Sequence, residues 1–164
     1  MAQSCPEARD RARLSLMNDD AMLDLAIMRL QRAYADLATR RAFSEVAELA
    51  TPDAIFSFDL RSGQIFEVKG VVAFGEFGAR MTERFSFYEY IPLNFVVAAE
   101  ADGRARGRAY SLEVAEDRET GAWIEVYGAY DDEYAQIEGT WRFAQRRYRT
   151  YGRRWGGDLQ AFPL

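Results

Sequence analysis

The sequence predicts an α+β fold, in which a cone-shaped, curved sheet of mixed but mainly antiparallel strands packs on three helices of the N-terminal half. Three patterns lead to this prediction. Apolar residues recur at helical spacing through residues 21–49, an alternating hairpin pattern follows at residues 54–69, and four long alternating segments separated by short polar turns come after Pro92. The expected order of elements is α-α-β-β-α-β-β-β-β.

The helices are predicted from their periodicity and their end signals. The first begins near Asn18, where acidic residues can cap its N-terminus, and it ends at the basic pair 40–41. A short second helix covers residues 43–49 and stops at the Thr-Pro-Asp sequence that follows, because proline has no N–H to donate. The third helix runs from residue 71 to about residue 84.

The strands are predicted from alternation and turn residues. Residues 54–60 and 64–69 pair as a hairpin across the turn at 61–63. The Asp-Gly and Glu-Gly dipeptides further along mark tight hairpins between longer strands. These four strands are expected at residues 93–99, 104–115, 123–136 and 140 to about 151.

The chain is expected to form one pocket domain at residues 18–152, between an N-terminal arm (1–17) and a C-terminal tail (153–164). Its 164 residues, 49% of them hydrophobic and 14% aromatic, are enough for one large core. The arm lacks the apolar segment of a signal peptide, and no run is long enough to span a membrane. We therefore expect a soluble, cytoplasmic protein, in keeping with the single cysteine, Cys5.

Charge and residue spacing exclude several kinds of site. The net charge of −5 does not suit a general nucleic-acid binder. No spacing typical of metal ligands occurs, so no metal is expected. Gly70, Gly75 and Gly78 do not form a phosphate-binding loop, because no βαβ unit surrounds them.

The segment 34–54, Gly128-Ala-Tyr130 and Gly139-Thr-Trp-Arg-Phe143 carry a family resemblance. With the order of elements, they make residues 20–150 similar to the nuclear transport factor 2-like superfamily, a cystatin-like fold, and above all to its SnoaL-like and scytalone dehydratase-like branch. That resemblance implies a small-molecule pocket. It also implies either a dehydratase, dehydrohalogenase, cyclase, isomerase or lyase without a cofactor, or a protein that only binds.

The resemblance also implies catalytic positions, and this chain departs from them. In the dehydratase-like group a His paired with an Asp is the base, but the sequence has no histidine. Thr39 stands at the Asp position, and the spacing to Asn94 places Tyr90 at the His position. In the steroid isomerase group a helix tyrosine and a strand carboxylate act together; Tyr34 matches the first, and Phe58 stands at the second.

Four residues are therefore the predicted catalytic groups. Tyr34 and Tyr90 would exchange protons with substrate oxygen or donate hydrogen bonds to it, while Arg80 or Lys69 would stabilise the developing anion. The alternatives are a core aromatic for Tyr34, packing for Tyr90 and surface charges for the two cations. The predicted substrate-binding residues are Thr39, Phe58, Asn94, Tyr110, Tyr127, Tyr130 and Arg147.

Two functions are compatible with these residues. The first is a cofactor-independent lyase, dehydratase or isomerase acting by proton transfer on a bulky aromatic or polycyclic molecule, such as a lignin-derived phenol. The second is a small-molecule-binding or protein-interaction domain that has lost the His–Asp pair. Either form is expected to assemble as a homodimer or homotrimer, because the outer face of such a sheet is usually too apolar to stay exposed.

Overall fold

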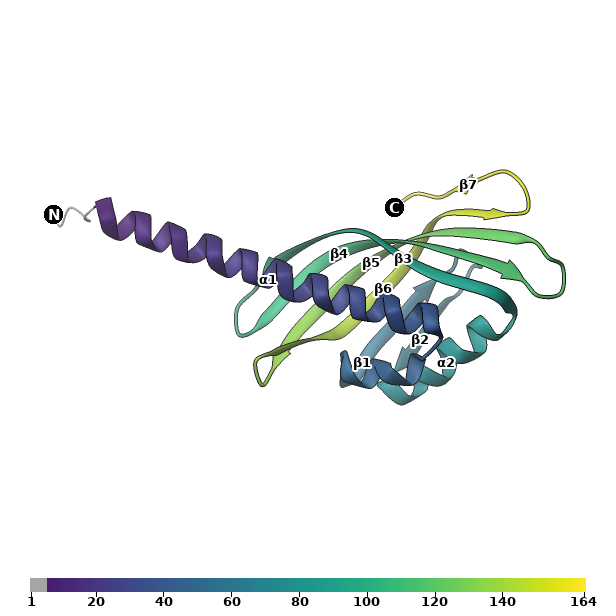
Figure 1. Ribbon diagram of the computed structural model, residues 1–164, viewed down its shortest axis with the longest axis horizontal. Helices are drawn as coiled ribbons and strands as arrows, with labels where there is room; N and C mark the ends of the chain where they lie inside the picture. Colours follow the sequence, from purple (N-terminus) through teal and green to yellow (C-terminus); the bar gives the residue numbers. More distant parts are fainter. Residues whose placement is uncertain (1–5) are drawn as a thin grey trace.

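The computed structural model describes the chain from Pro6 to Leu164, and its side chains from Asn18 onward. It confirms the predicted α+β class: three helices pack against one curved, open, seven-stranded sheet. The helices are α1 (Pro6–Arg40), the 3-10 helix η1 (Phe43–Glu48) and α2 (Val71–Glu83). Figure 1 shows α1 crossing the sheet and extending beyond it toward the N-terminus.

The sheet has the order β2-β1-β6-β5-β4-β3. Strand β1 pairs in parallel with β6, and the other neighbours are antiparallel. Short β7 pairs with β6 on the same edge as β1, past the end of β1. The strands are β1 (Ala50–Asp59), β2 (Ile65–Lys69), β3 (Phe85–Ala99), β4 (Arg104–Asp117), β5 (Trp123–Ile137), β6 (Thr140–Trp155) and β7 (Gln160–Ala161).

Helix α1 begins earlier than expected, since it starts at Pro6 within the segment predicted as an arm. Residues 1–5 of that arm lie outside the described residues. The predicted apolar face of α1 is buried except for Ala21, and this face packs against β3 and β6. Its buried predicted residues are Leu23, Ile27, Leu30, Tyr34 and Leu37.

Strand β3 corrects the prediction that the long strands begin after Pro92. It starts at Phe85, and Pro92 lies inside it, paired with Ser111 of β4. Proline is tolerated there because β3 is an edge strand, where a missing N–H costs no ladder bond on the open side. Strand β6 likewise continues to Trp155, past the boundary predicted before residue 153, because Ile124 of β5 still pairs with it.

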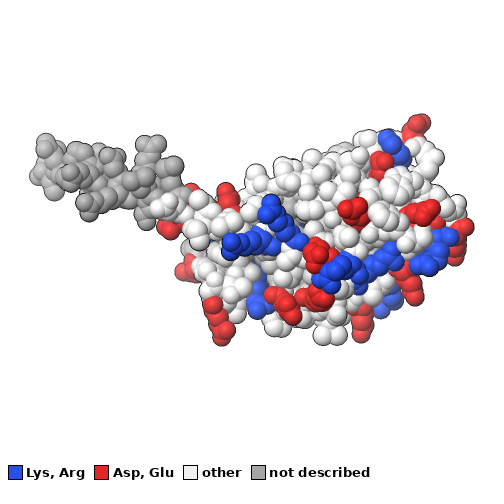
Figure 2. Space-filling model, in the orientation of Figure 1, with Lys and Arg blue, Asp and Glu red and all other residues white. Residues whose placement is uncertain are grey.

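The core lies between the concave face of the sheet and the helices. Phe56 of β1 stacks on Phe74 of α2 with ring centroids 4.0 Å apart, and Phe43 of η1 meets Phe74 edge to face at 6.2 Å. These rings fix α2 against the sheet. On the face that Figure 2 shows, basic and acidic side chains are intermingled instead of forming one basic surface.

Gly78 allows α2 to approach η1 closely. A Cβ built there would lie 2.5 Å from two ring atoms of Phe43. Alanine would favour the helix by about 1 kcal/mol, but overpacking costs about 1–3 kcal/mol. We therefore expect Gly78→Ala to lower the free energy of unfolding in urea denaturation. A variant more stable than the wild type would show that Phe43 moves aside freely.

Candidate functional site

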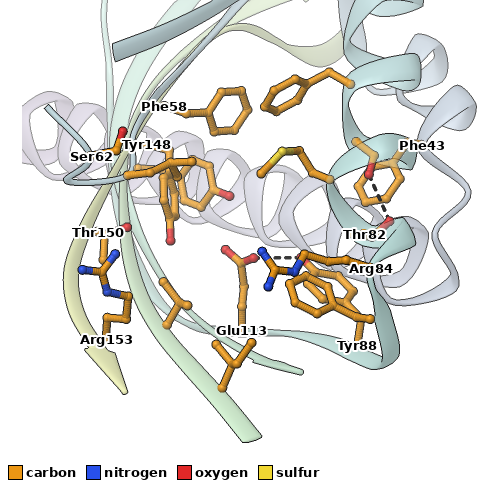
Figure 3. A pocket seen from close by; sticks show the side chains of 18 of the residues that line it. Phe43, Phe58, Ser62, Thr82, Arg84, Tyr88, Glu113, Tyr148, Thr150 and Arg153 are labelled. Atoms are coloured by element: carbon orange, nitrogen blue, oxygen red, sulfur yellow. Dashed lines mark hydrogen bonds between the residues drawn. The ribbon is translucent and has the colours of Figure 1, made fainter. Parts of the chain in front are cut away.

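A cavity of about 370 Å³ opens between the concave face of the sheet and α2. Apolar atoms form most of its wall, and ten of the lining side chains also carry polar groups (Figure 3). The apolar lining is Phe43, Phe58, Leu60, Phe74, Phe77, Met81, Phe85, Ile124, Val126 and Trp155. The polar lining is Tyr34, Ser62, Thr82, Arg84, Tyr88, Glu113, Tyr130, Tyr148, Thr150 and Arg153, and Gly78 completes the wall.

Alternation along β4, β5 and β6 turns three of these polar side chains inward. Glu113 is on β4, Tyr130 on β5 and Tyr148 on β6. The Tyr148 ring lies directly over Gly128 of β5, and a Cβ at that glycine would collide with it. Gly128 therefore leaves room for Tyr148 to cross the neighbouring strand. The ring centroids of Tyr148 and Tyr130 lie 4.9 Å apart.

Glu113 is the one carboxylate among the described residues that line the cavity. The Tyr88 hydroxyl donates a hydrogen bond to its Oε2 atom at 2.9 Å. Burial raises the pKa of Glu113 above its ordinary value, and the phenols of Tyr88 and Tyr148 partly counter this rise. A carboxyl whose pKa is raised in this way is suited to take up and return a proton.

The phenols around Glu113 are donors and not bases. Burial raises the pKa of Tyr34, of Tyr88, of Tyr130 and of Tyr148, so that each keeps its proton at neutral pH. Their O–H groups can stabilise negative charge on a substrate oxygen.

Tyr34 and Tyr90 contact each other. Their rings contact edge to face with centroids 5.4 Å apart, but Tyr90 packs behind Tyr34 and does not line the cavity. The Thr39 hydroxyl accepts a hydrogen bond from the Tyr90 backbone N–H at 3.0 Å and lies 3.4 Å from its carbonyl oxygen as a donor. Thr39 thus fastens the end of α1 to β3, and it is not among the residues that line the cavity.

A buried charged cluster lies beneath the phenols. Arg146 and Asp132 are almost fully inaccessible, and the Arg146 Nε atom lies 2.9 Å from an Asp132 oxygen. Gln31 and Tyr134 complete the cluster, donating to the other Asp132 oxygen at 2.8 and 3.0 Å. The guanidinium carbon of Arg146 lies 4.0–4.2 Å from the ring centroids of Tyr34, Tyr130 and Phe143. Its positive charge therefore acts on two of the cavity phenols.

The other predicted site residues divide between the cavity and the surface. Phe58 and Tyr130 line the cavity together with Tyr34. Tyr110 and Tyr127 lie on the outer face of the sheet, where both contact Tyr151.

The remaining four are away from the cavity. Arg147 is exposed on the outer face and pairs with Glu133 at 3.1 Å. Arg80 is exposed on α2 with Glu76 as its neighbour, and Lys69 and Asn94 are exposed on β2 and β3. The structure does not bring Arg80 or Lys69 to the phenols, because their helix and strand positions face solvent.

Sequence reasoning missed Glu113, Tyr88, Tyr148, Arg84 and Arg153. A signal for Glu113 was present, since it shares its strand parity with Ala109, Ser111 and Ala115, which are all buried. The short side chains of these three residues leave space on the inner face of the sheet, and the longer Glu113 side chain can lie in that space. Within the described residues, no group of three or more metal-ligating side chains occurs, and no helix is long and apolar enough to cross a membrane.

This chain is similar to a known domain family in sequence and to several solved structures in fold. A family model for the SnoaL-like domain matches residues 20–147. A candidate scytalone dehydratase from Novosphingobium aromaticivorans has a TM-score of 0.71 at 19% identity, with 90% of this chain and 93% of that one covered. A hexachlorocyclohexane dehydrochlorinase from Novosphingobium barchaimii has a TM-score of 0.73 at 16% identity, covering 90% and 99%.

A third similar structure has a different proposed activity. It is a candidate aromatic ring hydroxylase from Novosphingobium aromaticivorans, with a TM-score of 0.67 at 24% identity and coverages of 84% and 92%. No curated protein matches this chain in sequence. At these identities the structural likenesses show a shared fold.

Proposed function

Because the chain belongs to the SnoaL-like domain family, we propose that it is a cofactor-independent lyase, dehydratase or isomerase. It acts by proton transfer on a bulky aromatic or polycyclic small molecule bound in the cavity. The observation that carries this proposal is Glu113, a carboxyl with a raised pKa that is hydrogen-bonded to Tyr88 inside an aromatic cavity. The elimination reactions named for two structural neighbours support the same class of chemistry.

In the proposed reaction, ionised Glu113 removes a proton from the substrate, and the electron pair left behind moves toward a substrate oxygen or expels a leaving group. Tyr34, Tyr130 and Tyr148 donate hydrogen bonds where negative charge develops. Arg146, stacked behind two of these rings, favours that charge electrostatically. The protonated Glu113 then returns the proton to the leaving group or to another atom of the product.

Phenolic substrates fit this scheme. Removing the proton of a ring hydroxyl lets the ring expel a leaving group through a quinone-methide-like intermediate, without a metal or a nucleotide. The aromatic wall formed by residues such as Phe58 and Phe77, stacked at 4.9 Å, offers flat surfaces to a ring of this kind. This supports an aromatic substrate.

The alternative is a domain that binds a small molecule or a protein without turning anything over. It is favoured by the replacement of the family's His–Asp pair with Tyr90 and Thr39, whose hydroxyl bonds to backbone. Against it stands the convergence of a carboxyl and four phenols on one cavity, which a passive apolar pocket does not need. The tyrosines on the outer face support self-association as a homodimer or homotrimer in either case.

The experiment that tests the proposal screens phenolic dimers and steroid-like ketones in D₂O without any added cofactor. Mass spectrometry and NMR follow elimination, isomerisation and deuterium incorporation. We expect at least one ligand class to show exchange or product formation that depends on the protein. Binding of these ligands with no exchange and no product across the panel would instead support the non-catalytic function.

A further inference from the structure

Two arginines stand at the solvent end of the cavity, on opposite sides of Glu113 in Figure 3. Arg84 follows α2, and Arg153 belongs to β6. The Arg84 side chain is 51% exposed and Trp155 is 48% exposed, whereas Tyr34 and Phe74 of the inner wall are almost inaccessible. The arginines therefore mark the entrance, where a charged part of a ligand can stay hydrated.

The charge of Arg84 is already paired with a carboxylate of the protein. Its Nη2 atom lies 2.5 Å from Asp117, and the guanidinium also packs over Trp155, with 4.7 Å to the ring centroid. Arg84 and the Thr120 backbone hold the pKa of Asp117 down at about 2, so the carboxylate stays ionised. Arg84 thus forms a fixed, nearly neutralised part of the entrance.

Arg153 differs from its neighbours on β6. Arg147, Arg149 and Arg154 each pair with a carboxylate on the outer face. Arg153 faces the cavity side, and no carboxylate among the described side chains lies within ion-pairing distance of it.

The C-terminal tail holds the Arg153 guanidinium in place. The side chain donates to Gln160 Oε1 at 3.0 Å and lies over the Phe162 ring at 5.5 Å. The result is an oriented, uncompensated cation at the entrance of an apolar cavity.

We propose that the ligand of this cavity is an aromatic carboxylic acid whose carboxylate binds Arg153 while its rings fill the aromatic interior. This inference rests on the proposed function, and it names the substrate class. The arrangement sets the orientation of the ligand. The Glu113 carboxylate in the interior repels the carboxylate of the ligand, and Arg153 at the entrance attracts it. The group that loses the proton then faces Glu113, and the ion pair stays away from the reaction.

The test compares naphthoate with naphthamide, two probes of nearly equal size that differ in charge, by isothermal titration calorimetry. Wild-type protein is expected to bind naphthoate about tenfold more tightly than naphthamide, since a charge-assisted hydrogen bond supplies that difference. The preference is expected to fall as salt rises to about 0.5 M, because the entrance is open to solvent. In Arg153→Gln the two affinities become equal, and Arg153→Lys keeps part of the preference.

Two control variants separate charge from structure. Arg154→Gln removes the adjacent cation, which pairs with Glu125 on the other face, and is expected to keep the wild-type preference. Phe162→Ala loosens the tail but leaves the charge, and it also keeps most of the preference. Equal affinities in wild type, or an unchanged preference in Arg153→Gln, would overturn the inference while naphthamide binding still supports an aromatic site. Failure of both probes to bind would overturn the proposed function as well.

Discussion

Replacing Glu113 by glutamine is expected to lower turnover by about 10²- to 10⁴-fold while ligand binding is retained. Glutamine fills nearly the same volume and still accepts the hydrogen bond from Tyr88, so the cavity keeps its shape. It cannot take up a proton. The loss should therefore appear in kcat, with KM nearly unchanged, in the assay that identifies a substrate.

The pH dependence provides a second readout of the same residue. The pKa of Glu113 is raised by burial, so the ionised base forms only as the pH rises through a value above that of an ordinary glutamate. Activity should rise with pH along that limb, and the limb should be absent from the residual activity of Glu113→Gln. The neighbouring phenols add no limb near neutrality, because the pKa of Tyr34 and that of Tyr148 are raised.

Stability should change in the opposite direction to activity. The folded pKa of Glu113 lies above its unfolded value, so the native state binds the proton more tightly, and stability falls as the pH rises between the two values. At neutral pH the buried carboxylate therefore destabilises the fold. Glu113→Gln should be the more stable protein in urea denaturation at neutral pH and should lose this advantage in acid.

A matched control is Glu116→Gln, on the same strand. Glu116 is exposed and bonds to Ser86, outside the cavity, so its loss should leave both the activity and the pH profile as they are. Wild-type turnover in Glu113→Gln, or an equal fall in both variants, would contradict the assignment of Glu113 as the acid–base group.

Asp132→Ala is expected to lower the free energy of unfolding by about 3–5 kcal/mol, because it leaves the Arg146 charge buried and unpaired. The Asp132 carboxylate receives hydrogen bonds from Arg146, Gln31 and Tyr134, and all four side chains are buried. Burial by itself would lower the pKa of Arg146, but Asp132 and the nearby phenols shift it upward, so the arginine stays charged. Urea denaturation measures the loss.

The adjacent residue supplies the control. Asp131 is on the outer face, where it pairs with Arg108 and Arg149 at partly exposed positions, and Asp131→Ala should cost only about 0.2–1 kcal/mol for each pair. The double variant Asp132→Ala, Arg146→Met should recover part of the loss, since it removes the unpaired charge. Equal losses in Asp131→Ala and Asp132→Ala would show that removing Asp132 does not leave a costly unpaired charge on Arg146.

Local sequence signals predicted the elements well where short-range physics decides them. The helical face of α1, the turn at residues 61–63 and the start of α2 after Gly70 all follow from spacing, glycine and proline. Pro92 misled the prediction of β3, because a proline excludes a central strand but not an edge strand. Which strand lies at an edge is a property of the whole sheet.

The site was predicted less completely, because strand parity breaks at bulges. Phe143 and Arg146 are both buried on the inner face although they are three residues apart, since the register with β5 shifts between Glu133 and Tyr134. Counting along β6 therefore could not separate Tyr148, which points inward, from Arg147, which points outward. Because of the same register shift, Arg146 is the arginine of β6 that is buried on the inner face.

The amino-acid sequence by itself determined the fold class, the family resemblance and the absence of histidine, because periodicity, turn residues and composition are local properties of the chain. Only the tertiary structure decided that Glu113 lies in the cavity beside Tyr88, and that Tyr90 packs behind Tyr34 outside the cavity lining. Burial, which sets the pKa of each group, arises when β3, β4 and β6 curve around one space, and residues far apart in sequence create it together.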